Sequence, residues 1–135
     1  MDNVSPAERS RQMSLIRSKN TRPERVVRRL LHLAGFRYRL HRPDLPGKPD
    51  LVFPARRKVI FVNGCFWHMH PGCAAAHIPR TRAAYWKPKL RLNRRRDLKN
   101  IRNLERQGWE AAVVWECEIE EPAQLERRLK VFLRG

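Results

Sequence analysis

The chain has 135 residues, enough for one domain with one core and too few for two. Its net charge of +17, from 30 Lys and Arg against 13 Asp and Glu, indicates a polyanionic partner, and nucleic acid fits better than a membrane surface. Residues 1–11 lack the apolar segment of a secretory signal, and no apolar run approaches a membrane span. The odd count of 3 cysteines excludes a complete disulfide framework and favours a reducing compartment.

Two helix starts open the chain. Residues 5–8, Ser-Pro-Ala-Glu, form a capping box that predicts a short Arg-rich helix ending near Arg17, inside a basic helical arm over residues 1–20. Residues 21–24, Thr-Arg-Pro-Glu, repeat the signal. The apolar positions behind them have helical spacing, so a second helix is expected to end at Gly35.

Four short apolar or alternating runs then predict strands, at residues 36–40, 50–53, 58–62 and 111–115. The third run is continuous enough to be buried on both faces, and residues 41–49 between the first two form a Pro-rich loop.

Three helical segments are expected in the second half. Thr81 should cap a short helix through Trp86 that breaks near Pro88. A longer helix over 89–107 should turn inward Leu90, Leu98, Ile101 and Leu104, and a last helix should cover 120–133. This order predicts a single α/β sandwich over residues 1–135, with helices flanking a central mixed β-sheet.

The loop after the third strand carries soft metal ligands. Cys65, Cys73 and the distant Cys117 supply three thiols, and a fourth ligand would complete a tetrahedral structural zinc site. The spacing leaves open whether that ligand is His68, His70 or His77. The alternative interpretation is that the cysteines are small core or loop thiols.

Several acids and one imidazole are candidates for catalysis. Asp50 follows a proline at the start of a strand, where a carboxylate can hold Mg²⁺ against a phosphate oxygen. His68 can take a proton from water near neutral pH. Asp97 in the long helix could equally form a surface ion pair, and Glu24 could serve only in its capping box.

Large aromatic residues gather in the same part of the chain. Phe66, Trp67, Tyr85 and Trp86 lie in or near the irregular region. Rings on a basic protein can enter a base step and unstack it, at least cost where the pair is already defective. The alternative is that they pack the loop onto the sheet.

These features together resemble the Vsr endonucleases, which act in very short patch mismatch repair. The carriers include Leu-Pro-Gly-Lys-Pro-Asp at 45–50, Val-Ile-Phe-Val-Asn-Gly-Cys-Phe-Trp-His at 59–68 and Val-Trp-Glu-Cys at 114–117, and the Gly-Cys-Phe-Trp-His string is highly specific. Further matches are Arg17-Ser18-Lys19-Asn20-Thr21 with Glu24, Pro79-Arg80-Thr81-Arg82 with Tyr85-Trp86, and Asn93 with Asp97. The resemblance runs from about Arg9 to Glu118.

The resemblance implies a restriction-endonuclease-like fold and a Mg²⁺-dependent enzyme that nicks double-stranded DNA. The nick would fall 5′ of the T in a T:G mismatch left by deamination of 5-methylcytosine. It also implies a monomer in the bacterial cytoplasm, associated with the nucleoid, with mismatch-repair proteins as possible partners and no membrane.

The resemblance also assigns residues to roles. Asp50 and the Val62 backbone carbonyl would bind Mg²⁺, and His68 would be the general base. Asp97 would support the histidine, with Glu24 at the edge of this network. The remaining assignments are an intercalating wedge of Phe66, Trp67 and Trp86, and a structural zinc held by Cys65, His70, Cys73 and Cys117.

This chain departs from the family at two positions, and two other functions stay open. Some members carry His in place of Asn63 and Thr in place of Val62. At position 63 this chain therefore lacks a second imidazole. The third strand also lacks the acid that many nucleases place on it. The alternative functions are a restriction-type nuclease without a mismatch requirement and a noncatalytic, zinc-stabilised nucleic-acid-binding module.

Overall fold

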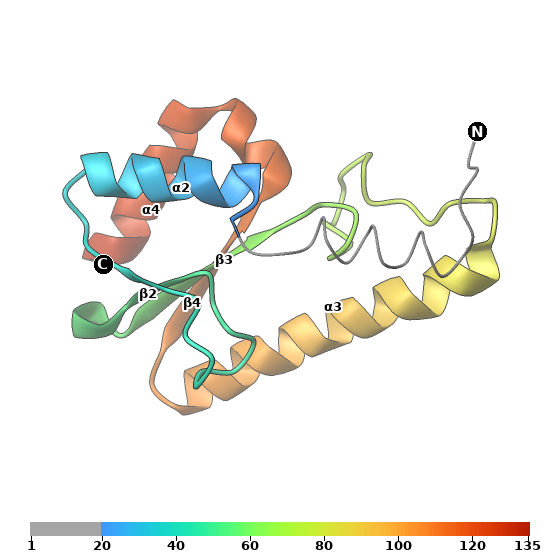
Figure 1. The fold of residues 1–135 in the computed structure, drawn as a ribbon, viewed down its shortest axis with the longest axis horizontal. Coiled ribbons are helices and arrows are strands. Elements are labelled where there is room, and N and C mark those ends of the chain that lie inside the picture. The colour runs from blue at the N-terminus through green and yellow to red at the C-terminus, as the bar shows by residue number, and fades with distance from the viewer. Residues whose placement is uncertain (1–19) are drawn as a thin grey trace.

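The computed structural model describes residues 20–135 (Figure 1). The helix expected after residue 5 and nearly all of the expected basic arm over 1–20 lie outside this range. The described elements are, in order, α2 (Arg22–Leu33), β1 (Arg39–Leu40), β2 (Leu51–Phe53), η1 (Pro54–Arg56), β3 (Lys58–Asn63), α3 (Ala83–Arg106), β4 (Glu110–Trp115), η2 (Glu116–Glu120) and α4 (Pro122–Arg134).

The strands form one mixed sheet in the order β1-β2-β3-β4, which confirms the expected mixed α/β architecture. β1 pairs antiparallel with β2, and β2 pairs antiparallel with β3 through the register Leu51↔Ile60. β3 and β4 are parallel, with Val62 opposite Val114, and α3 makes the crossover between them.

The two faces of the sheet bury different sets of side chains, because successive residues of a strand point to opposite faces. Helices α2 and α4 pack together on one face (Figure 1). Their buried residues join Leu51, Phe53, Ile60 and Val114 in one cluster. On the other face, Val52 and Val59 pack against Leu104 of α3 and Trp109. The sheet therefore forms the middle layer of a sandwich.

The helices differ from their predicted forms in several places. α3 is continuous through Pro88, which lies near its start and removes one backbone hydrogen bond. Its N-cap is Arg82 in a left-handed conformation, so Thr81 is not the cap. Leu98 was expected to face inward and is 44% exposed. The last helix, expected over residues 120–133, is α4 and begins at Pro122, and the short 3-10 helix η2 precedes it.

The edge strands are less regular than the sequence suggests. β1 covers only Arg39–Leu40, both exposed, and Phe36, at the start of the expected strand, is buried in the core outside the sheet. β4 was expected to be buried, but it lies at the edge of the sheet and only Val114 is buried.

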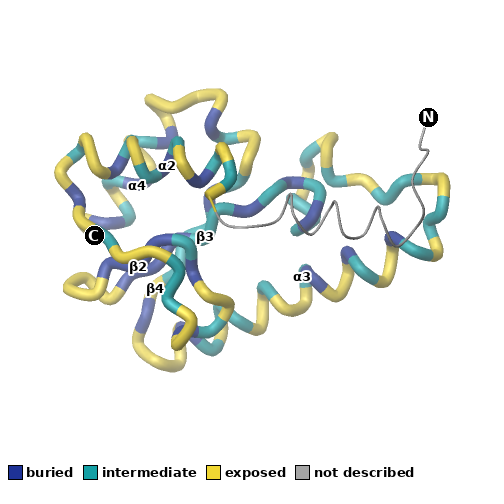
Figure 2. Tube along the Cα trace, in the orientation of Figure 1, coloured by how far each residue is buried: buried dark blue, intermediate teal, exposed yellow. Residues whose placement is uncertain are grey.

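The long helix α3 extends well beyond the sheet, and the loop from residue 64 to 82 runs beside it (Figure 1). Asn93 Nδ2 donates a hydrogen bond to the Trp67 carbonyl oxygen at 3.2 Å, and Arg94 donates to that of Met69 at 3.1 Å. Along α3, buried and exposed positions alternate, as expected for a helix packed on one side (Figure 2). Within residues 20–135, no helix is long and apolar enough to cross a membrane.

Candidate active site and thiol cluster

Asp50 precedes β2 and faces the end of β3. Its Oδ2 accepts a hydrogen bond from the Val62 N–H at 2.7 Å, as expected if strand pairing brings Asp50 to the base of the loop. Burial raises the pKa of Asp50 from 3.8 to about 7 against that hydrogen bond, and the nearby Glu24 carboxylate raises it further. The other carboxylate oxygen, Oδ1, does not take part in this hydrogen bond and could bind a cation.

His68 comes from the loop and meets Asp97 from the middle of α3. The distance from His68 Nδ1 to Asp97 Oδ2 is 2.5 Å. Asp97 is therefore paired with the catalytic candidate, and the alternative of an isolated surface ion pair does not describe its environment. A carboxylate at Nδ1 keeps the proton on that nitrogen and leaves Nε2 as the acceptor.

Asp50 and the His68–Asp97 pair open on one cavity of about 350 Å³. Val62 and Asn63, at the end of β3, also line it, and Asn63 is 8% exposed. The remaining walls come from the loop before β2 and from α3 and include His41, Gly47, Lys48 and Asn100. Gly47 has a φ of +77°, and a Cβ there would lie 3.0 Å from atoms of Phe61 and Asn100, so this wall requires glycine.

Glu24 serves both the helix start and the edge of this site. The Glu24 N–H donates to Thr21 Oγ1 at 3.4 Å, so Thr21 caps the helix, whereas Glu24 Oε1 accepts from the Asn20 N–H at 3.3 Å and not from the Thr21 N–H that a capping box uses. Its Oε2 pairs with Arg28 and with His41 Nε2 at 2.8 Å. Glu24 is buried and lies near Asp50, which accounts for its effect on the pKa of Asp50.

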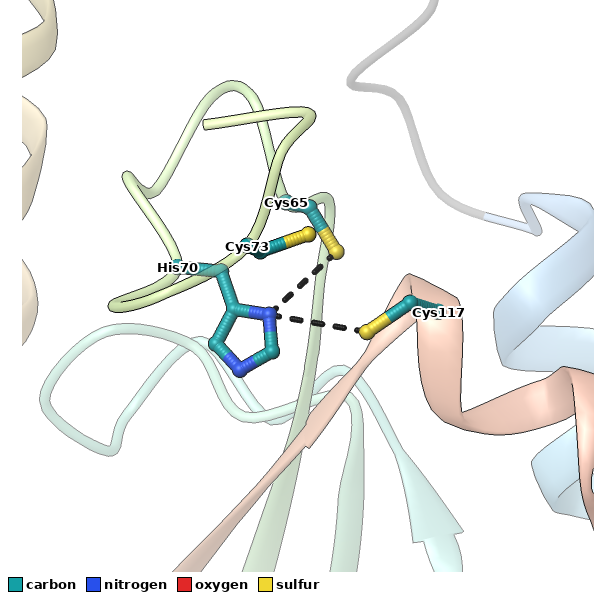
Figure 3. Close-up of side chains that lie close together, drawn as sticks. All are labelled: Cys65, His70, Cys73 and Cys117. Carbon is teal, nitrogen blue, oxygen red and sulfur yellow. Dashed lines mark hydrogen bonds between the residues drawn. The ribbon is translucent and has the colours of Figure 1, made fainter. Parts of the chain in front are cut away.

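Four soft-ligand side chains converge at a second place (Figure 3). Donor atoms of Cys65, His70, Cys73 and Cys117 lie within 4.8 Å of one another. His70 Nδ1 is 3.7 Å from Cys65 Sγ and 3.5 Å from Cys117 Sγ, and its ring stacks on Trp115. Burial raises the pKa of Cys65 to about 12, and the thiols of Cys117 and Cys73 contribute.

The three histidines left open by spacing therefore separate clearly. Only His70 joins the thiols. His68 pairs with Asp97, and His77 is exposed, with its Nδ1 3.1 Å from the Ala74 carbonyl oxygen. Three ligands come from the loop and Cys117 comes from η2, so the cluster joins the loop to the end of β4 (Figure 3).

The expected wedge residues form one aromatic cluster between the loop and α3. Phe66 meets Trp67 and Trp86 edge to face, with ring centroids 5.3 Å and 5.5 Å apart. Trp67 and Trp86 are 7% and 4% exposed, whereas Phe66 is half-buried. The packing alternative raised for these rings is thus present, and Phe66 is the most accessible of the three.

His41 is the residue at the site that the sequence does not indicate. Its position in the loop 41–49 suggests no function. Only the strand pairing could have indicated it, because the pairing of β1 with β2 places the residue after β1 beside the residue before β2. The His41 N–H donates to the Asp50 carbonyl oxygen at 3.2 Å.

Comparison with known proteins agrees with this geometry. A family model described as DNA mismatch endonuclease Vsr matches residues 1–74. Type II nicking enzyme V.XorIIP of Xanthomonas oryzae pv. oryzae is 53% identical over 132 residues, covering 98% of this chain and 96% of that protein. Type II nicking enzyme V.NmeAIP of Neisseria meningitidis is 41% identical, covering 98% and 94%. DNA mismatch endonuclease Vsr of Escherichia coli is 40% identical, covering 82% and 70%.

Proposed function

The chain belongs to the Vsr family and is a DNA endonuclease, and we propose that it nicks duplex DNA 5′ of the T in a T:G mismatch arising from deaminated 5-methylcytosine, with Mg²⁺ as cofactor. The observation that carries the proposal is the convergence of Asp50 and the His68–Asp97 pair on one cavity. An acid able to hold a cation and an oriented imidazole are what phosphodiester hydrolysis requires.

The oxygen atoms around Asp50 suit Mg²⁺. Asp50 Oδ1 and the Val62 carbonyl oxygen are hard ligands, which Mg²⁺ prefers while keeping several waters. When bound there, Mg²⁺ would polarise the scissile phosphate and stabilise the negative charge that develops on it. The Val62 N–H holds the other carboxylate oxygen at 2.7 Å, so Asp50 is fixed before a cation arrives.

His68 is proposed to take the proton from the attacking water. Its Nδ1–H donates to Asp97, which holds the ring and favours the imidazolium once the proton is taken. Glu24 is proposed to act at the edge, through its contacts with His41 and Arg28.

We propose zinc for the thiol cluster. With Zn–S of about 2.3 Å and Zn–N of about 2.0 Å, a tetrahedral ion sets S···N separations of about 3.5 Å. The separations of 3.7 Å and 3.5 Å at His70 Nδ1 fit this geometry. Bound zinc would deprotonate the thiols and hold the loop that carries His68 against η2.

The aromatic cluster is proposed as the wedge at the mismatch, with Phe66 leading and Trp67 and Trp86 supporting it from behind. Unstacking a base step costs a few kcal/mol, and less at a defective pair. Duplex DNA with a T:G mismatch is therefore the proposed substrate, and the charge of +17 supplies the phosphate contacts.

Two sets of measurements test the proposal. Duplexes that place G, A or C opposite one T, in a range of flanking sequences, are incubated with protein and Mg²⁺. Preferential nicking of T:G is expected, whereas equal cleavage of the T:A duplex would establish the restriction-type alternative.

Variants separate an enzyme from a binding module. Asp50→Asn and His68→Gln should abolish nicking and retain DNA affinity. His77→Gln is the matched control, because His77 is exposed and outside the cavity. Binding without nicking by the wild-type protein in every context would favour the noncatalytic module.

A further inference from the structure

His41 lies between two carboxylates at the wall of the cavity. Its Nε2 is 2.8 Å from Glu24 Oε2 and 4.0 Å from Asp50 Oδ1. The side chain is 13% exposed, and the residue lines the same cavity as His68. The steps proposed for hydrolysis use His41 only as a contact of Glu24, although it also faces the oxygen of Asp50 that the Val62 N–H leaves free.

The backbone of His41 is also directed at Asp50. Its φ is +48°, a left-handed conformation that costs a residue with a side chain some energy and is often found at functional positions. In this conformation the His41 N–H donates to the Asp50 carbonyl oxygen at 3.2 Å while the ring reaches Glu24. The backbone of His41 is therefore bonded to Asp50, and its ring, held by Glu24, lies 4.0 Å from the Asp50 carboxylate.

Glu24 determines which nitrogen of His41 carries a proton. Its side chain is 3% exposed, and a buried carboxylate requires donors on both oxygens. Oε1 accepts from the Asn20 N–H, and Oε2 accepts from Arg28 and faces His41. His41 Nε2 therefore acts as a donor to Glu24, and the ring fills the space between Glu24 and Asp50.

We propose that His41 is a positioning residue that keeps the free oxygen of Asp50 turned toward the cavity and available to a divalent cation. The contacts form a chain from Arg28 and Glu24 in α2, through His41 after β1, to Asp50 before β2. Without the ring, the two carboxylates would share one space, and Glu24 would lose a donor. This inference rests on the proposed role of Asp50 as a cation ligand.

The donor role predicts an order among variants. A Gln side chain places an amide N–H near the position of Nε2 and can still donate to Glu24. Asn is too short to do so, and Ala removes the donor and the ring. If His41 acted through its imidazole, as a cation ligand or proton carrier, Gln would be as defective as Ala.

Calorimetric titration with Mn²⁺, on zinc-loaded protein without DNA, measures the cation site directly. Loss of a residue that orients a metal ligand typically weakens binding 10–100-fold, so we expect His41→Ala and His41→Asn to bind Mn²⁺ at least about tenfold more weakly and His41→Gln within about twofold of wild type. His32→Ala is the control, because His32 is exposed at the end of α2. Equal binding by wild type and His41→Ala, or equal defects in Gln and Ala, overturns the inference.

Thermal unfolding without divalent cations separates positioning from folding. If His41→Ala does not fold, the comparison of Gln with Asn decides, since equal Mn²⁺ affinity in these two overturns the inference. Asp50→Asn distinguishes the two proposals. If it binds Mn²⁺ as the wild type does, the proposed function fails at Asp50. If it loses binding while His41→Ala does not, only the inference about His41 fails.

Discussion

Lowering the pH from 8 to 6 is expected to weaken Mg²⁺ binding about tenfold, because Mg²⁺ must displace the proton of Asp50. Burial raises the pKa of this carboxyl to about 7. A group with that pKa is about 0.9 ionised at pH 8 and about 0.1 ionised at pH 6. With the ordinary value of 3.8, it would be ionised at both pH values and the affinity would not change.

The assay is calorimetric titration with Mg²⁺ in the absence of DNA, repeated in two buffers of different ionisation enthalpy to count released protons. Each bound ion should release about 0.9 proton from Asp50 at pH 6 and about 0.1 at pH 8. His68→Gln removes another titratable side chain that lines the cavity and should keep the same pattern. A change in affinity of less than about twofold would refute the raised pKa.

The same pKa makes the cation-free fold depend on pH. The folded pKa of about 7 exceeds the ordinary 3.8, so folding favours the protonated form. This contribution to the free energy of unfolding is complete below about pH 4 and is lost as the pH rises to about 7, by up to about 4 kcal/mol. Cation-free Asp50→Asn should therefore be more stable than wild type at pH 8, by urea denaturation, and no more stable near pH 4.

Three further predictions concern the histidine pair, the thiol cluster and the aromatic cluster. Asp97→Asn should lower the single-turnover nicking rate by about 10²–10⁴-fold with little effect on DNA affinity, because His68 would lose the group that fixes its tautomer. Purified protein should contain about one zinc per chain by elemental analysis, and Cys117→Ser should lower both zinc content and the thermal midpoint. Trp86→Ala should lower the free energy of unfolding by about 3–5 kcal/mol in urea denaturation. Phe66→Ala should lower it less and mainly reduce the preference for T:G over T:A. Equal losses of stability in the two variants would contradict the proposal that Trp86 supports Phe66 from behind.

Local patterns predicted the parts of the fold that depend on the neighbouring residues. The capping box at Thr21, the apolar run of β3 and the soft ligands of the loop are all visible in short stretches of sequence. The continuous apolar run of β3 predicted burial on both faces. The neighbouring strand β2 shows the same arrangement, because Leu51 and Val52 point to opposite faces and belong to separate core clusters.

Features that depend on distant residues could not be predicted in this way. Leu98 has the spacing of an inward residue, but α3 extends past the sheet and leaves it 44% exposed. Position along the sheet determines that β4 is an edge strand, and its own sequence does not reveal this. His41 reaches the site only through strand pairing and a left-handed backbone, and its residue type predicts neither of them.

The central claim is that this cavity cleaves one strand at a T:G mismatch. Its most direct test uses a T:G duplex labelled on both strands and the matching T:A duplex. Both are incubated with protein and Mg²⁺, and any cut is mapped to the nucleotide. The expected result is a single nick on the 5′ side of the mismatched T, with the G strand intact and the T:A duplex uncut. A break in both strands, or the same nick in T:A, would contradict the account.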